Sequence, residues 1–307
     1  MYLFYLIQDF EKVRTEMIVV PGPASQILGV EIAKLMENAR LAPVLFKNFP
    51  DGEVYTRIDK DLKGEHVIIV QSTYHPQDQH LMQLYQLIDA AKNADAEKIT
   101  VFVPYLAYSR QDKKFLEGEP LSARIICKTI ENLGANEIYV LDIHSERVLD
   151  FFTIPTHNLI AVKLFGEYFK TLSLSNPIII APDEGALNKA EEAARMMKTE
   201  CTYLEKTRDR HTGEISVEIK EIDVNNRDLI LIDDIISTGG TMVKAIEMAK
   251  QQGANKIYAA CSHALLIENA KARILQAGAT DIIGTNSVDS ECAKISIAPL
   301  FIEEFLR

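Results

Sequence analysis

The sequence predicts an α/β protein made of two tandem halves, each a mainly parallel sheet flanked by helices. Short runs of β-branched apolar residues alternate along the chain with amphipathic stretches. The chain has 307 residues, and single cores stop growing at roughly 250–300 residues, so two domains are expected. A similar helix–glycine–strand pattern also occurs twice, at 133–139 and at 252–258.

The individual elements follow from these patterns. The apolar runs expected to form strands are 17–20, 67–70, 99–103, 138–141, 178–180, 229–232, 257–261 and 282–284. The amphipathic stretches expected to form helices are 25–39, 79–93, 122–133, 161–172, 185–197, 241–252 and 267–277. Strands that alternate with helices are joined by crossovers, so their pairing is expected to be parallel.

The expected domain boundary lies near 153–158, where Pro155 interrupts the pattern. The first half then covers 1–154 and the second 155–298, and the tail 299–307 is expected to pack back on the first half. Residues 1–10 are mostly apolar but have no basic leader, so we interpret 1–16 as a possible extension rather than a signal peptide. A charged loop at 207–214 is a candidate lid.

Composition excludes several classes of partner. The net charge is −11, and a surface that holds nucleic acid more often has the opposite sign, so we expect no nucleic-acid partner. No apolar run reaches the roughly 20 residues that span a bilayer, so we expect no membrane partner. The four cysteines show no CxxC spacing, which argues against a disulfide framework or zinc site and favours the cytoplasm.

The strongest functional signal is the segment 229–241. A buried strand leads to two adjacent acids, Asp233 and Asp234, and a small-residue turn then opens a helix. Glycines allow close backbone approach, and N–H groups at a helix start favour an anion, so the turn predicts a phosphate pocket that needs no lysine. The acids would repel phosphate, so they are expected to accept hydrogen bonds from sugar hydroxyls or to hold a metal. The alternative is a plain strand–turn–helix with an acidic cap.

This segment resembles the motif shared by type I phosphoribosyltransferases and the synthetases of phosphoribosyl pyrophosphate (PRPP). The resemblance implies two phosphoribosyltransferase-like domains, with the second half binding ribose 5-phosphate. It also implies that Asp233 and Asp234 bind the ribose hydroxyls. The residues implied to bind the 5-phosphate are Ser237, Thr238, Gly239, Gly240 and Thr241.

Further segments resemble PRPP synthetases in order, so the similarity covers nearly all of 17–307. Phe49-Pro-Asp51-Gly-Glu53 resembles the loop that holds the adenine of ATP. Phe49 can stack on a base, and the two acids can accept hydrogen bonds from its exocyclic amine. Taken alone, a simple Pro-Asp-Gly turn is the better interpretation of this loop.

A second stretch, 104–112, follows a predicted strand at the edge where α/β proteins bind ligands. It resembles the ATP-binding segment of the same family, which implies that Arg110, Gln111 and Asp112 contact ATP in the first half. The guanidinium of Arg110 offers a planar fork for phosphate oxygens. A solvated polar loop is the alternative.

His144 and Asp183 each follow a strand, and the resemblance implies that both contact a Mg²⁺ that bridges the phosphates of ATP. A capped surface histidine is the alternative, and direct nitrogen ligation of magnesium would be unusual. After Asp183, the sequence Gly-Ala-Leu-Asn-Lys189 replaces the glycine pair and arginine of regulated bacterial and animal enzymes. This departure resembles the archaeal-type branch and puts regulation by phosphate or ADP in doubt.

Lys206 and Arg208 match the Lys-x-Arg of the family's catalytic loop. The resemblance therefore implies ribose-phosphate pyrophosphokinase activity, with ATP and ribose 5-phosphate as substrates, in a homo-oligomer where a neighbouring Phe49 loop completes the ATP site. A phosphoribosyltransferase and a non-catalytic regulatory subunit are the alternatives.

Overall fold

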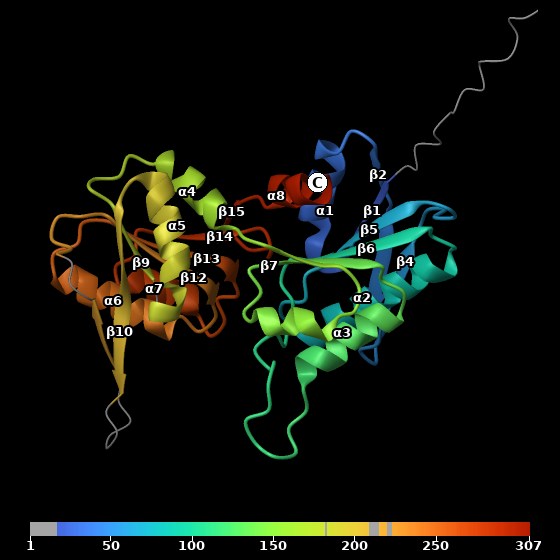
Figure 1. Cartoon of the computed structure of the whole chain (residues 1–307), viewed down its shortest axis with the longest axis horizontal. Helices are drawn as coiled ribbons and strands as arrows, with labels where there is room; N and C mark the ends of the chain where they lie inside the picture. The colour runs from blue at the N-terminus through green and yellow to red at the C-terminus, as the bar shows by residue number, and fades with distance from the viewer. Residues whose placement is uncertain (1–16, 182, 209–214, 220–222) are drawn as a thin grey trace, which may run out of the picture.

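The computed structural model describes residues 17–181, 183–208, 215–219 and 223–307, which form two halves side by side (Figure 1). The possible extension 1–16 and most of the candidate lid, 209–214, lie outside these ranges. Among the described residues, no helix combines the length and apolar character that crossing a bilayer requires.

The first half contains a six-stranded sheet in which every pairing is parallel, in the order β2-β1-β5-β6-β7-β8. Its strands are β1 (Met17–Pro21), β2 (Ala39–Leu41), β5 (His66–Val70), β6 (Lys98–Val103), β7 (Glu137–Leu141) and β8 (Thr156–Leu159). A separate antiparallel hairpin consists of β3 (Val44–Asn48) and β4 (Val54–Ile58).

The second half contains a seven-stranded sheet in the order β11-β10-β9-β12-β13-β14-β15, parallel except for the pair β10–β11. Its strands are β9 (Ile178–Ala181), β10 (Glu200–Arg208), β11 (Ile215–Ile219), β12 (Leu229–Ile236), β13 (Ile257–Ala264), β14 (Asp281–Thr285) and β15 (Ala293–Ile295). The predicted fold class, two α/β halves with mainly parallel sheets, is therefore confirmed.

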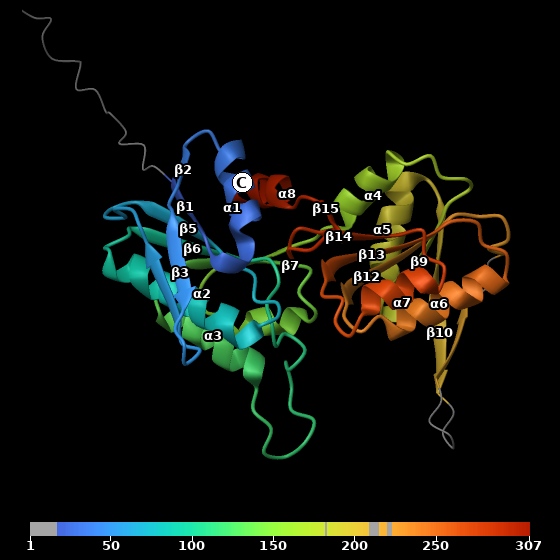
Figure 2. The same ribbon diagram turned by 180° about the vertical axis from the view of Figure 1, so that it is seen from behind.

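Helices cover both faces of each sheet (Figure 2). They are α1 (Gln26–Leu35), α2 (Gln77–Asn93), α3 (Ser122–Asn132), α4 (Val162–Lys170), α5 (Leu187–Met197), α6 (Gly240–Gln251), α7 (Ala270–Gln276) and α8 (Ala298–Phe305). Short 3₁₀ turns are η1 (Pro23–Ser25), η2 (Glu146–Phe151) and η3 (Glu184–Ala186). The helix expected over 25–39 ends at Leu35, because Ala39 already belongs to β2.

The segment around Pro155, where we placed the domain break, forms an edge strand rather than a linker. Residues Thr156–Leu159 pair with β7, so the first sheet continues beyond residue 154 and the chain enters the second half through α4. The exact boundary between the domains stays a prediction.

The repeated helix–glycine–strand pattern has the expected geometry. Gly134 and Gly253 follow α3 and α6 with φ of +117° and +84°, a conformation that side chains rarely adopt. At the junction between α2 and β6, which has no glycine, Asp95 also takes a positive φ, of +57°. Each junction turns the chain from a helix into the next strand.

One apolar core extends through both halves. It includes Leu28 of α1, Phe165 of α4, Ile230 of β12 and Phe301 of α8. Two further cores lie on the opposite faces of the sheets, under α2 and α3 in the first half and under α6 and α7 in the second. Because side chains of both sheets share a core, the halves pack as one body.

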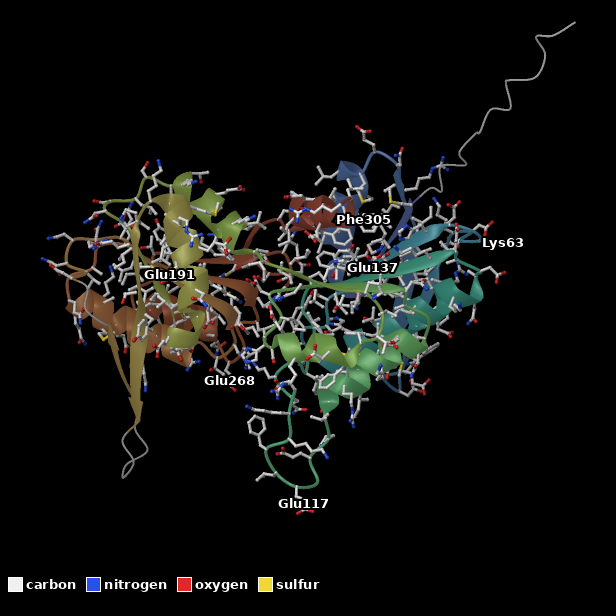
Figure 3. All side chains as sticks on the ribbon, in the orientation of Figure 1. Lys63, Glu117, Glu137, Glu191, Glu268 and Phe305 are labelled. Atoms are coloured by element: carbon white, nitrogen blue, oxygen red, sulfur yellow. The ribbon has the colours of Figure 1, made fainter. Side chains whose placement is uncertain are left out.

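Helix α8 leaves the second half and returns to the first, where it packs beside α1 (Figure 1). The ring of Phe301 stacks on that of Phe102 with centroids 4.5 Å apart, and it meets Tyr139 edge-on at 5.2 Å. Figure 3 shows Phe305, at the end of this helix, above Glu137 of β7. The helix thus covers a face of the first sheet that would otherwise meet water.

We predict that Phe301→Ala lowers the free energy of unfolding by about 3–5 kcal/mol, because the ring is fully buried and its removal leaves a cavity. Urea denaturation would measure the change. The matched control is Leu306→Ala at an exposed position of the same segment, expected within about 0.5 kcal/mol of the parent. Equal effects of the two substitutions would contradict the packing role of α8.

Candidate active site

The two sheets meet where β7 and β13 end. Ser262 donates a hydrogen bond from Oγ to Oδ2 of Asp142 at 2.5 Å, and His263 donates from Nε2 to the carbonyl of Leu141 at 3.0 Å. Nδ1 of His263 lies 2.9 Å from Oγ of Ser287. All five residues are buried, and we call them the seam. Buried polar groups need partners, so these bonds fix the end of β7 against the second sheet.

The histidine of the seam is neutral. Burial lowers the pKa of His263, since a charged imidazolium would lose its hydration between the halves. A carbonyl oxygen only accepts hydrogen bonds, so the bond to Leu141 requires the ring proton on Nε2. The ring also meets Tyr105 edge-on at 5.0 Å. His263 therefore acts as a structural contact and keeps the backbone before His144 in place.

A cavity of about 330 Å³ lies beside the seam. We call it the interlobe cavity. In the second sheet, β9 has β10 on one side and β12 on the other. A crevice at the carboxyl ends of such strands is the usual ligand site of α/β folds. Its lining residues are Asp142, Ile143, His144, Glu146, Asn158, Ile160, Val162, Phe165, Asp183, Ala186, Lys189, Ile232, Asp233, Asp234 and Ser262.

An ion pair joins the halves inside this cavity. Nδ1 of His144 lies 2.9 Å from Oδ2 of Asp234. This hydrogen bond raises the pKa of His144 above its usual value, against the opposing effect of partial burial. Burial acts to raise the pKa of Asp234, but the hydrogen bond from His144 and its interaction with Asp233 outweigh burial and lower the pKa. The pair is therefore ionic over an acidic to neutral range.

Asp233 behaves differently from its neighbour. Burial, followed by the hydrogen bond and charge of Asp234, raises its pKa well above the usual carboxyl range. Its Oδ1 accepts a hydrogen bond from the backbone N–H of Asp234 at 2.8 Å. The two adjacent acids thus separate into one ionised carboxylate and one that holds its proton more readily, as like charges in contact require.

Asp183 and His144 face the same cavity from opposite halves. Asp183 caps η3 by accepting from the N–H of Ala186 at 3.2 Å, which anchors its carboxylate at the cavity. Within the described ranges, no three histidine, cysteine or acidic side chains form a ready metal cluster. The residues fit magnesium nonetheless, because that ion commonly takes one or two carboxylates and completes its shell with phosphate oxygens and water.

The turn after Asp234 forms a second cavity of about 490 Å³. Ser237, Thr238, Gly239, Gly240 and Thr241 all line it, at the start of α6. Gly239 has φ of +73°, and a Cβ there would meet Ile274 of α7 at 2.9 Å. The loop therefore requires glycine both for its conformation and for its packing on α7.

Three basic side chains lie at this loop. Arg110 of the first half and Lys244 of α6 also line the cavity, and Arg273 of α7 donates to the carbonyl of Thr238. A lysine thus lines the cavity that the sequence predicted to need none, whereas the binding of phosphate there stays a prediction. Lys244 lies four residues after Gly240, one helical turn away on the same face of α6, and this spacing was the available signal.

The ATP-binding residues expected in the first half fall into two groups. Arg110 lines the second cavity, Asp112 accepts a hydrogen bond from Ser145 at 2.8 Å, and Gln111 is exposed. The chain after them forms a loop that projects from the first half, with Glu117 at its tip (Figure 3). Of this group, Arg110 therefore lies next to the loop 237–241, although the two come from different halves.

The other group, Phe49, Asp51 and Glu53, lies in and beside the turn between β3 and β4. None of the three lines either cavity. The ring of Phe49 is 40% exposed and meets Tyr55 of its own hairpin at 6.3 Å. The fold of one chain thus does not bring this loop to the other predicted site residues.

Lys206 and Arg208 occupy the end of β10, opposite Val217 and Ile215 of β11. The sequence predicted that they begin a loop, whereas their backbone continues a strand. Residues two apart share one face of a strand, so positions 206 and 208 lie on the same face. The turn that follows is outside the part of the chain that the structure describes.

Comparison with known proteins is consistent with this architecture. Residues 17–134 match the family model of the N-terminal domain of ribose phosphate pyrophosphokinase, and residues 152–287 match that of the phosphoribosyl transferase domain. The chain is thus an α/β protein that joins these two types of domain in sequence. Its structure is similar to that of the phosphoribosylpyrophosphate synthetase from Mycobacterium smegmatis, with a TM-score of 0.83, 29% identity, and 95% and 98% of the two chains covered.

Two curated relatives indicate the family to which the chain belongs. The ribose-phosphate pyrophosphokinase of Methanobrevibacter smithii is 40% identical over 92% of this chain and 97% of its own length. That of Methanosarcina acetivorans is 41% identical over 95% of this chain and 100% of its own. The chain belongs to the ribose-phosphate pyrophosphokinase family. The resemblance to the archaeal-type branch is supported by these two archaeal relatives.

The ion pair of His144 and Asp234 predicts a pH dependence of stability. Because the folded pKa of His144 is raised, its contribution is fully present below the unfolded value of 6.5 and is lost as pH rises through the folded value. Asp234 has a lowered pKa, so its contribution is present above about 3.9 and is lost as pH falls further.

We therefore expect the difference in unfolding free energy between the parent and His144→Ala to be largest at about pH 4–6.5 and to shrink above it. Urea denaturation at several pH values would measure this difference. His75→Ala, at an exposed histidine, is the control. A difference that stays constant from acidic to alkaline pH would refute the ionic character of the pair.

Proposed function

We propose that this chain is a ribose-phosphate diphosphokinase, which transfers the β,γ-diphosphate of ATP to ribose 5-phosphate and releases AMP and PRPP. The observation that carries the proposal is the pairing of two cavities. The phosphate loop 237–241 adjoins Arg110 of the predicted ATP segment, and Asp233 lines both the phosphate cavity and the interlobe cavity. A sugar phosphate and a polyphosphate could thus meet at the two adjacent acids.

In the proposed reaction, the oxygen of the ribose 1-hydroxyl attacks the β-phosphorus of ATP, and the bond from that phosphorus to the α-phosphate oxygen breaks. The hydroxyl proton is lost and AMP leaves. Positioning and positive charge do most of the work in phosphoryl transfer. The loop would bind the 5-phosphate through backbone N–H groups and hydroxyls, and Asp233 and Asp234 would orient the ribose hydroxyls.

Magnesium, held by Asp183 and by the neutral form of His144, whose Nδ1–H would still donate to Asp234, would supply positive charge to the transferred phosphoryl oxygens. We further propose that Arg110, Gln111 and Asp112 bind ATP, and that Lys206 and Arg208 close over the transferred group. The carboxylate of Asp183 at the interlobe cavity supports the magnesium assignment, because Mg²⁺ prefers oxygen ligands. The position of 206 and 208 on one face of β10 supports the proposal that Lys206 and Arg208 close over the transferred group.

The loop of Phe49, Asp51 and Glu53 leads us to propose that the protein is a homo-oligomer built from dimers. We also propose that it acts in the cytoplasm. This loop does not line the cavities of its own chain, and Leu45 and Phe46 on the same hairpin are 47% and 49% exposed. Exposed apolar side chains that gather on one element are typical of interaction surfaces. A neighbouring chain would then supply this loop to the adenine of ATP.

The direct test incubates the purified protein with ATP, ribose 5-phosphate and Mg²⁺ and measures AMP and PRPP. We expect equimolar formation of both, lost on chelation of the metal. Asp234→Asn should lower the rate about 10- to 100-fold, since it removes a charge-assisted contact, while Asp150→Asn, at an exposed acid of η2, should not. PRPP consumption without ATP would indicate a phosphoribosyltransferase, and no turnover a regulatory subunit.

Gly239→Ala tests the phosphate loop. The added methyl group meets Ile274 and forces φ of +73° on alanine, so we expect the KM for ribose 5-phosphate to rise about 10-fold, from strain of about 1–3 kcal/mol. The KM for ATP should change little. Gly64→Ala is the matched control, because Gly64 has the same φ but nothing within 4 Å. If both variants keep the parent KM, the loop does not bind the sugar phosphate.

A further inference from the structure

The two halves of the chain follow the same plan. Their sheets have corresponding strand orders, β2-β1-β5-β6-β7-β8 and β10-β9-β12-β13-β14-β15. The helix after the last strand of each of these sheets packs on the opposite half, α4 on α5 and α8 on α1 (Figure 1). Each half therefore contributes its last helix to the other half.

Hydrogen bonds at the ends of β7 and β14 show the same correspondence. Asp142, directly after β7, accepts a hydrogen bond from the N–H of Ala161 at 3.1 Å, just before α4. Asn286, directly after β14, accepts one in the same way from the N–H of Ile297 at 3.0 Å, just before α8. The loops that follow these two strands are thus structurally equivalent.

This equivalence places a further cavity between the halves. It has a volume of about 280 Å³ and lies between residues 24–31, at the start of α1, and residues 286–296, around β15. The interlobe cavity lies in the corresponding way between the start of α5 and the loop after β7. Among the described residues none lines both spaces, and we call the one at the start of α1 the α1 cavity.

The α1 cavity differs from the interlobe cavity in its possible metal ligands. Val288 lies three residues after β14, at the position that His144 has after β7. The segment 22–25 after β1 contains no acid, whereas Asp183 follows β9. The α1 cavity thus has the same place in the fold as the interlobe cavity but a different chemistry.

The charges of the α1 cavity disfavour an anionic ligand. Glu31 and Asp289 line it, and Lys294, the basic residue of its described lining, pairs with Asp281. Two carboxylates repel a phosphate unless a free cation lies nearby. The other polar groups of the lining are hydroxyls and amides, which both donate and accept hydrogen bonds as sugar hydroxyls do: Ser25, Gln26, Asn286, Ser290 and Ser296.

Glu31 is held at the cavity by side chains of the other half. Its Oε2 accepts hydrogen bonds from Nδ2 of Asn286 at 2.8 Å and from Oγ of Ser296 at 2.6 Å. A carboxylate can accept about four hydrogen bonds, so Glu31 retains capacity for about two more. Two neighbouring hydroxyls of a sugar ring supply such a pair of donors.

A second polar group of the cavity also lacks a partner. Oγ of Ser290 is buried, and within the part of the chain that the structure describes it makes no hydrogen bond. Buried polar groups nearly always have a partner, and a hydroxyl of a ligand in the cavity would provide one. Ile27 and Ile295 add apolar surface to the lining, against which the carbon atoms of a ring can pack.

We propose that the α1 cavity binds an uncharged pentose, whose neighbouring hydroxyls donate to Glu31 and pair with Ser290. The pentose is either a free sugar or the ribose ring of a nucleoside, because both present the same hydroxyls. The site lies apart from both substrate cavities, so the inference does not depend on the proposed function. A ligand here contacts α1 and the loop after β14, and its binding therefore holds the two halves together.

The test uses D-ribose and adenosine as probes, with titration calorimetry for affinity and the thermal midpoint as a second measure of binding. We expect binding that raises the midpoint, and an affinity about 10-fold lower for the 2-deoxy form of the same probe, which lacks one of the neighbouring hydroxyls. Binding of D-ribose alone assigns the free sugar, and binding of adenosine alone assigns a nucleoside. If neither probe binds the parent, the inference is overturned.

Two variants connect the binding to this cavity. Glu31→Gln keeps the size of the side chain but removes its charge, and we expect the affinity to fall about 10- to 100-fold. Ser290→Ala should lower the affinity about 5- to 10-fold and leave the thermal midpoint of the free protein unchanged, because its Oγ makes no hydrogen bond there. Glu37→Gln and Ser173→Ala, at exposed positions, are the matched controls and should bind as the parent does.

Both probes also resemble parts of the proposed substrates, so the location of binding needs its own control. Asp234→Asn changes the interlobe cavity and leaves the α1 cavity intact, and we expect it to bind the probe with parental affinity. Parental affinity in Glu31→Gln, with loss of affinity in Asp234→Asn, would place the pentose at the substrate site and overturn the inference. A rise in the thermal midpoint with Mg²⁺ alone that Glu31→Gln abolishes would also overturn it, because the carboxylate would then hold a cation.

Discussion

The geometry of the site depends on a buried polar contact between the ends of two strands. Asp142 and His263 lie where the sheets meet, and each satisfies a group of the opposite half that would otherwise be buried without a partner. Such contacts tolerate little displacement, because a buried polar group without a partner is costly. His144 and Asp234 can pair only because the seam holds their strands at this separation.

An acidic protein can still present positive charge locally at its cavities. Its net charge is −11, yet the few cations near the site are concentrated at the cavities. Arg110 and Lys244 line the phosphate loop, and Lys189 lines the interlobe cavity. Backbone N–H groups at the start of α6 add partial positive charge without a basic side chain. Local arrangement therefore outweighs the overall charge.

Sequence patterns predicted the parts of the fold that are buried on both faces. Runs such as 67–70 and 229–232 are continuously apolar because helices cover both sides of their sheets. The edge strand β8 was missed, since its sequence Thr-His-Asn-Leu is mostly polar. The exposed hairpin β3–β4 was missed for the same reason, because its pattern mixes charged and apolar residues.

The candidate site, too, could be predicted only in part, because some of its residues are adjacent in sequence and others are far apart. Asp233, Asp234 and the loop after them are contiguous in sequence, so their chemistry could be predicted from one segment. Ser262 and Asp142 are 120 residues apart, and neither carries a motif that names its partner. Only the packing of β13 against β7 brings them together. Roles that arise from such long-range contacts cannot be obtained from local spacing.

The return of α8 to the first half has a consequence for synthesis on the ribosome. The first half emerges early, but the face that Phe301 covers stays uncovered until the second half has been made. Domains usually complete their folding in the order of translation. Here the earlier domain finishes last, and its apolar sheet face must avoid aggregation in the meantime.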